Sequence, residues 1–194
     1  KRADALLDEP PLTMLVSAQA AQMRGDEEAA GDFFKAMMER PETEFLGLRG
    51  LLNQAIKRGD KQEALSLARR AYRLQPKSTW VAANMFELQT QTAQWLDARV
   101  TCDDLKRHKL IGADEAKRRK AVLSYQLSQE AKARGDAGEA LDCLLDAHKL
   151  APGFIPAVTD LAEHWVTGGK ASKAAKMIET TWEAEPHPAL IEPY

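Results

Sequence analysis

The chain has few of the residues that mark disulfide-bonded, membrane-spanning or nucleic-acid-binding proteins. Two cysteines, Cys102 and Cys143, occur in 194 residues, too few for a disulfide framework at this length. Aromatic residues make up 6% of the chain. No run of about 18 apolar residues occurs that could cross a membrane. The 27 Lys and Arg residues nearly balance 29 Asp and Glu, which gives a formal charge of −2 and excludes a strongly basic nucleic-acid binder.

The start of the sequence also lacks familiar signals. It begins with Lys1 instead of Met, and no charged segment followed by an apolar run marks a signal peptide. We therefore expect a processed product or an excised fragment. Residues 1–9 read as the end of a preceding helix, and residues 187–194 as a short tail.

The residues that are abundant favour helices. Ala, Leu, Glu, Lys, Gln and Arg dominate, while runs of β-branched residues are scarce. These side chains lose little conformational entropy in a helix. The composition predicts an all-α protein.

A repeated turn signal divides the chain into similar segments. A Gly or Ala is followed five residues later by an Ala, and the turn positions are Gly25, Gly59, Ala93, Gly135 and Gly169. The steps between them are 34, 34, 42 and 34 residues. A period of about 34 residues is that of the tetratricopeptide (TPR) helix–turn–helix repeat. The spacing therefore predicts a TPR-like α-α solenoid, a right-handed superhelix of about five hairpins.

The residues at each turn explain why the chain reverses there. Gly tolerates the left-handed angles that end a first helix. An Asp directly after it, as at Asp60, caps the second helix by accepting backbone N–H groups. A small Ala then lets the paired helices approach closely, at Ala30, Ala64, Ala98, Ala140 and Ala174.

Helix and repeat boundaries follow from this frame. First helices are expected at 11–24, 44–58, 79–92, 114–134 and 155–168, and second helices at 27–39, 61–74, 95–108, 137–150 and 171–184. The repeats are about 11–44, 45–78, 79–113, 114–154 and 155–188, within a single domain over residues 1–194. The eight extra residues of the longer step lengthen the first helix of the fourth repeat, with Asp114 as its expected N-cap.

Four stretches resemble one particular TPR family. The segment Arg40 to Leu51 (RPETEFLGLRGL) is similar to the most distinctive part of HemY-type proteins of proteobacteria. Three further stretches, 86–89, 117–120 and 182–188, are also similar to that family. The resemblance implies a bacterial inner-membrane protein associated with haem biosynthesis, anchored by N-terminal helices that this chain does not contain. The part present here is then expected to be soluble, with haem-biosynthesis enzymes as its protein partners.

Residues suited to catalysis or to metal binding are sparse. No His or Cys pair has metal-ligand spacing, and no nucleophile–base order or phosphate-cradling loop is detectable. His108 and His148 fall near the ends of second helices, where His is favourable against the helix dipole. Both cysteines fall at interior positions of helix pairs. We expect no enzyme, no metal and no cofactor. The alternative is a porphyrin or haem carrier with His187, or Tyr125, as an iron ligand.

The polar residues of the first helices give the leading candidate site. In a TPR array these helices line the concave face, and the candidates are Arg49, Asn53, Lys57, Asn84, Glu87, Tyr125, Gln129 and Lys132. Arg49, Asn53 and Asn84 resemble part of the clamp with which some TPR domains hold a peptide's C-terminal carboxylate. The next repeat should add two basic residues, but has Val122 and Gln126. The other interpretation is the ordinary polar lining of a solvated groove.

The basic run Lys117 to Lys120 is a second candidate surface. Four cations near the positive end of a helix are unfavourable, which favours an anionic partner such as acidic lipids or an acidic protein surface. The alternative is a solvated helix start. Taken together, the sequence predicts a non-catalytic interaction scaffold of the HemY type; a haem carrier and a general peptide-binding adaptor are the alternatives.

Overall fold

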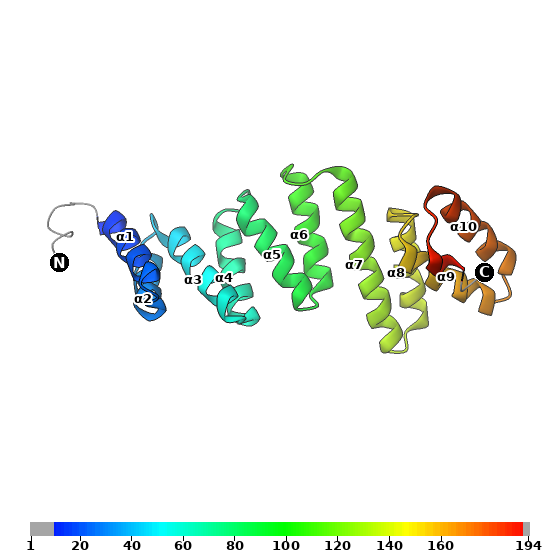
Figure 1. Ribbon diagram of the computed structural model, residues 1–194, viewed down its shortest axis with the longest axis horizontal. Coiled ribbons are helices and arrows are strands. Elements are labelled where there is room, and N and C mark those ends of the chain that lie inside the picture. The colour runs from blue at the N-terminus through cyan, green and yellow to red at the C-terminus, as the bar shows by residue number, and fades with distance from the viewer. Residues whose placement is uncertain (1–9, 192–194) are drawn as a thin grey trace. The chain divides into compact units, whose positions relative to one another are not determined.

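Within the residues that are described, the protein has ten α-helices and no strand. The computed structural model describes residues 10–191 (Figure 1). The helices are α1 (Pro10–Met23), α2 (Glu27–Met38), α3 (Glu44–Arg58), α4 (Lys61–Leu74), α5 (Thr79–Gln91), α6 (Trp95–Arg107), α7 (Ala113–Ala133), α8 (Ala137–Leu150), α9 (Ile155–Thr167) and α10 (Ala171–Ala184), with a 3₁₀ turn η1 (Pro188–Leu190). Every predicted helix boundary agrees within one residue.

The turns between paired helices have the predicted backbone. Positive φ angles of 73–80° occur at the turn glycines, Gly25, Gly59, Gly135 and Gly169. Ala93 takes the same place with φ 55°, although a side chain makes this conformation costly. The chain must reverse direction between the two helices of every repeat. The residue at this position therefore adopts a left-handed backbone conformation even where it is not glycine.

Capping by aspartate is confirmed in three of the turns. A carboxylate oxygen of Asp26, Asp60 and Asp136 accepts the N–H of the residue three positions on, at 2.9–3.0 Å. The prediction for Asp114 is wrong. Gly112, in an extended conformation, precedes α7, so the helix begins at Ala113 and Asp114 lies inside its first turn.

The chain divides into two compact units, Lys1–Gln94 and Trp95–Tyr194, and the boundary falls within the third predicted repeat. In unit 1, each of α1 to α5 packs against the next. Its core includes Phe34, Leu48 and Leu52, all nearly or fully inaccessible. The predicted small residues Ala30 and Ala64 are also buried.

In unit 2, α6 to α10 pack in the same successive way, and η1 packs on α9. Leu144, Val158, Leu161 and Leu190 belong to its core. As predicted, α7 is longer than the other helices, with 21 residues. The sense of coiling over all five repeats stays a prediction.

None of the helices in residues 10–191 is long and apolar enough to cross a membrane.

Candidate functional site

The exposed face of α3 carries three of the predicted groove residues. Arg49, Asn53 and Lys57 are spaced by four residues, so they lie in one stripe along the helix, and all three are exposed. The Arg49 guanidinium lies 5.0 Å from the centre of the Trp80 ring, at the start of α5. This cation–π contact joins α3 and α5, the first helices of the second and third repeats.

The same register continues along α5. Arg49 and Trp80 are 31 residues apart, and this offset places Asn53 level with Asn84. Further along, a small cavity of about 90 Å³ lies between Ile56 and the α3–α4 turn on one side and Asn84, Glu87 and Gln91 on the other. The Arg49–Trp80 contact and this cavity place Arg49, Asn84 and Glu87 between α3 and α5, and Asn53 and Lys57 continue the stripe along α3. We call this surface the α3–α5 face.

Several of these polar groups already have partners. The Lys57 ammonium lies 3.4 Å from a carboxylate oxygen of Glu27, and the Asn84 amide donates to the Trp80 carbonyl at 2.8 Å. Glu87 accepts from the Gln91 amide at 3.0 Å. The pKa of Glu27 is lowered by a hydrogen bond from Gln54 and by Lys57. Arg49 and Asn53 are thus the groups most open to a ligand.

In unit 2 the predicted residues are held by the protein itself. The Gln129 amide donates to Asp160 on α9 at 2.8 Å, again across an offset of 31 residues. The Tyr125 ring meets Phe154 edge to face, with centroids 5.5 Å apart. Burial, and then the nearby Asp160 carboxylate, raise the pKa of Tyr125. Lys132 is exposed. Tyr125 and Gln129 act here as a structural link between α7 and α9.

The candidate haem ligand also has a local role. His187 precedes η1, and its Nδ1 accepts the backbone N–H of Ala189 at 3.2 Å. The rest of the side chain is exposed. No group of three or more His, Cys, Asp or Glu in the described part of the chain could hold a metal ion.

The two cysteines differ in exposure. Cys102 is fully buried and donates its thiol hydrogen to the Ala116 carbonyl, with an S···O distance of 3.7 Å. Cys143 is only half-buried, so its predicted interior position is correct in part. Burial raises the pKa of both thiols. A raised thiol pKa lowers the fraction of reactive thiolate, which fits a packing role.

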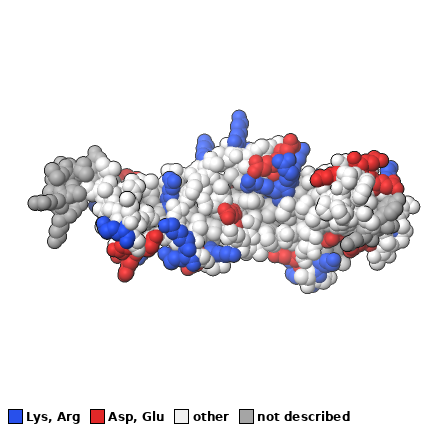
Figure 2. Space-filling view, in the orientation of Figure 1, with Lys and Arg blue, Asp and Glu red and all other residues white. Residues whose placement is uncertain are grey.

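Three of the four cations in the basic run at the start of α7 form ion pairs within the protein. Lys120 pairs with Asp103 at 3.0 Å, Arg119 with Glu115 at 2.6 Å, and Lys117 with Asp114 at 3.8 Å. Figure 2 shows basic and acidic side chains side by side over this end of α6 and α7. The expected electrostatic cost is therefore offset locally, and this run gives no argument for an anionic partner.

Sequence reasoning missed two members of the α3–α5 face. Trp80 was not assigned to the groove, because the 31-residue offset that pairs it with Arg49 is visible only in the structure. Ile56, which is 41% exposed, adds apolar surface beside the polar stripe. The face is therefore amphipathic and not purely polar.

Comparison with known proteins identifies the fold. No family model and no curated protein matches the chain. Among solved structures it is similar to YrrB, described as a TPR protein with an unusual peptide-binding site, at 17% identity and a TM-score of 0.50, over 97% of this chain and 93% of YrrB. It is also similar to a tetratricopeptide repeat protein from Parabacteroides merdae, at 19% identity and a TM-score of 0.50, over 94% and 83% of the two chains. The chain therefore has a TPR-like fold. None of these comparisons shows the HemY family.

Proposed function

We propose that this TPR-like protein is a non-catalytic adaptor that binds a peptide segment of a partner protein on the α3–α5 face. The observation that supports this most directly is the arrangement of Arg49, Asn53 and Trp80. A guanidinium and an amide are exposed in one stripe, and a half-buried aromatic ring lies beside them. Such a face offers hydrogen-bond donors for carbonyl or carboxylate oxygens and an apolar surface for a side chain.

The shared fold supports the same class of ligand. YrrB, which has a similar chain trace, is described as having a peptide-binding site. Helical repeat arrays present extended surfaces formed by successive hairpins, which suits an extended peptide. The two basic residues of a complete carboxylate clamp are replaced here by Val122 and Gln126. We therefore expect the peptide to be bound along its length, and not only through its C-terminal carboxylate.

A narrower version of the proposal is the HemY-type role. In it, the partners are haem-biosynthesis enzymes and the protein is tethered to a bacterial inner membrane. Its support is the sequence resemblance of Arg40 to Leu51. That segment also has a packing role here, since Thr43 donates its hydroxyl hydrogen to the Met37 carbonyl at 2.7 Å and Gly47 contacts α2 closely.

Peptide selection on the full chain tests the proposal. A random peptide library is panned on the immobilised protein, and selected peptides are measured by fluorescence anisotropy. We expect Arg49→Ala and Asn53→Ala each to weaken binding by about three- to tenfold, the value of a lost hydrogen bond.

Arg73→Ala is the matched control, because Arg73 is an exposed cation on a second helix of the same unit. It should leave the affinity unchanged. Peptides that bind wild type, Arg49→Ala and Asn53→Ala equally well would rule out the α3–α5 face.

A further inference from the structure

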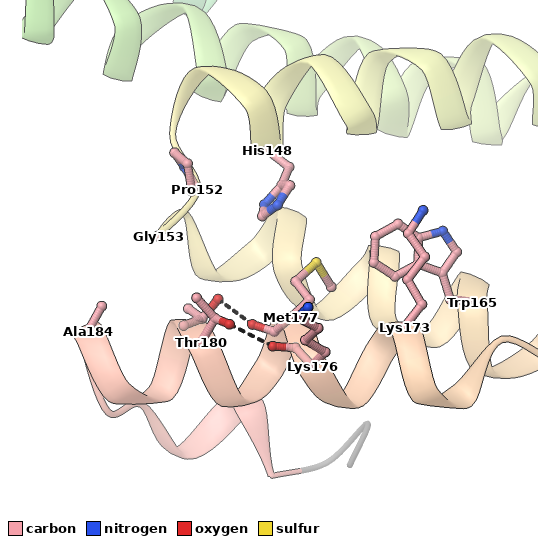
Figure 3. A pocket seen from close by; sticks show the side chains of 10 residues that line it. His148, Pro152, Gly153, Trp165, Lys173, Lys176, Met177, Thr180 and Ala184 are labelled. Atoms are coloured by element: carbon pink, nitrogen blue, oxygen red, sulfur yellow. Dashed lines mark hydrogen bonds between the residues drawn. The ribbon is translucent and has the colours of Figure 1, made fainter.

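A second cavity lies in unit 2, and its lining includes none of the predicted groove residues. Its volume is about 380 Å³, within the range of small-molecule sites. It lies between the end of α8 and one side of α10, with Trp165 of α9 at one end (Figure 3). The walls are mainly apolar, formed by residues such as Trp165, Met177 and Pro152.

The charged groups of this cavity have one sign. Within residues 10–191, its lining includes Lys173 and Lys176 but no Asp or Glu. The Lys173 ammonium lies 3.9 Å from the centre of the Trp165 ring, so its charge is held at the mouth. Lys173 is also in the first turn of α10, where the helix dipole favours an anion. Both features make the cavity attractive to a negative group.

His148 adds a neutral donor. Its Nδ1 is buried and has no hydrogen-bond partner among the described residues, and burial lowers the pKa of the ring, so the imidazole is neutral near pH 7. A buried N–H without a partner is rarer than a bare acceptor. The proton therefore belongs on Nε2, and the His148 side chain is one of the groups that line the cavity.

The two threonine hydroxyls that line the cavity donate their hydrogen bonds within α10. Thr180 donates to the Lys176 carbonyl and Thr181 to the Met177 carbonyl, each at 2.8 Å, as the dashed lines in Figure 3 show. The donors available to a ligand thus include the two ammonium groups and the imidazole, together with the indole N–H of Trp165. A ligand that satisfies them carries an anionic acceptor, and its remaining surface is apolar to match the walls.

We infer that this cavity binds a small monocarboxylic acid, whose carboxylate lies between Lys173 and Lys176 and whose aromatic or branched aliphatic body packs on Trp165 and Met177. This site is independent of the α3–α5 face and belongs to the other unit.

Titration of the full chain with 3-phenylpropionate tests the inference. Binding is followed by NMR through the ring signals of His148 and the indole signal of Trp165. We expect saturable shifts of both. Lys176→Ala should weaken the affinity by at least about fivefold, as for a lost charge-assisted hydrogen bond, and 3-phenylpropan-1-ol should bind at least about fivefold more weakly than the acid.

Two control variants locate the effect. Lys149→Ala removes an exposed cation next to His148 in sequence that does not line the cavity, and it should keep the wild-type affinity. Arg49→Ala, which tests the peptide face, should also keep it. Absence of saturable shifts, equal binding of the alcohol, or an unchanged affinity of Lys176→Ala would each overturn the inference.

Discussion

Two glycines of α3 have no left-handed backbone angle, yet neither leaves room for a side chain. A Cβ atom on Gly50 would collide with the ring of Phe34. A Cβ atom on Gly47 would lie 2.5 Å from the Phe34 carbonyl oxygen and 2.9 Å from Met38 Cγ. The close packing of α2 on α3 therefore depends on these two missing side chains.

Gly47→Ala is expected to destabilise unit 1 by about 1–3 kcal/mol, because the obstacle is backbone that cannot rotate away. Gly112→Ala is the matched control, since nothing lies within 4 Å of its Cβ position and its φ is −72°. The control should change the free energy of unfolding by at most about 1 kcal/mol, in the stabilising direction. Urea unfolding followed by circular dichroism measures both, and equal midpoints for the two variants would contradict the prediction.

The partly buried ring of His148 makes the stability of unit 2 depend on pH. Because burial lowers its pKa, the unfolded chain takes up this proton at a higher pH than the folded protein. The free energy of unfolding should therefore fall as the pH drops from about 6.5, the ordinary value for His, through the folded-state pKa.

His148→Leu should remove this contribution, so its free energy of unfolding should change less between about pH 7.5 and pH 5.5. Urea titrations at both pH values provide the measurement. If the free energy of unfolding falls equally for the wild type and the variant between these pH values, the His148 ring is not the cause.

The sequence predicted some of these single residues and not others. The turn glycines and the capping residues Asp26, Asp60 and Asp136 were predictable because their chemistry is local: each acts on backbone within a few positions. The roles of Gly47 and Gly50 were not, since they depend on where Phe34 lies in another helix. His148 was assigned a dipole interaction that needs a charged ring, whereas its burial favours the neutral ring.

Helix packing in unit 2 includes a polar link across three helices. Arg99 on α6 donates to the Ser124 hydroxyl oxygen of α7 at 2.9 Å and to Asp146 of α8 at 3.0 Å. Ser124 in turn donates to Asp146 at 2.8 Å and is fully buried. This network ties the long helix α7 to both neighbours near its middle.

Asp146→Ala is expected to destabilise unit 2 by about 1–3 kcal/mol, because it leaves the Ser124 hydroxyl and the Arg99 guanidinium without their shared acceptor. Asp142→Ala, one turn earlier on α8 and exposed, should change the free energy of unfolding by at most about 0.5 kcal/mol. Thermal and urea unfolding of the two variants provide the comparison. If Asp146→Ala is as stable as Asp142→Ala, the network contributes nothing to stability.

Helix boundaries were the best-predicted feature. The 34-residue period and the turn residues placed every boundary within one residue, because stop and start signals repeat at each hairpin. The start of α7 shows the limit, since Gly112 and not Asp114 precedes it. The pairing of Gln129 with Asp160 was also missed, because sequence alone does not give the register between first helices.

Separate cores in the two units lead to a prediction about folding. Unit 1 has its own cluster of buried residues from α1 to α5, and unit 2 has another that includes α8 to α10. Fragments 1–94 and 95–194 should each fold alone with a helical circular dichroism spectrum and a cooperative thermal transition. An unfolded fragment would instead support the single domain predicted from the repeats.

The function of the protein was predictable only as a class. The repeat period indicates a TPR-like solenoid, and such a fold serves many unrelated pathways. The α3–α5 face was predicted from helix positions, but the cavity around His148 was not, because its lining comes from α8, α9 and α10 and no motif in the sequence unites them.

One turn sequence occurs in both units with the same contacts. Residues 58–64 and 134–140 share Arg, Gly, Asp, Glu and Ala at matching positions. In each copy the Arg pairs with the Glu, and the Asp caps the following helix. Seven residues thus reverse the chain without help from distant parts of the protein. The same seven residues could therefore replace the Gly168–Ala174 connection, which has no side-chain hydrogen bond at its N-cap, in an engineered variant.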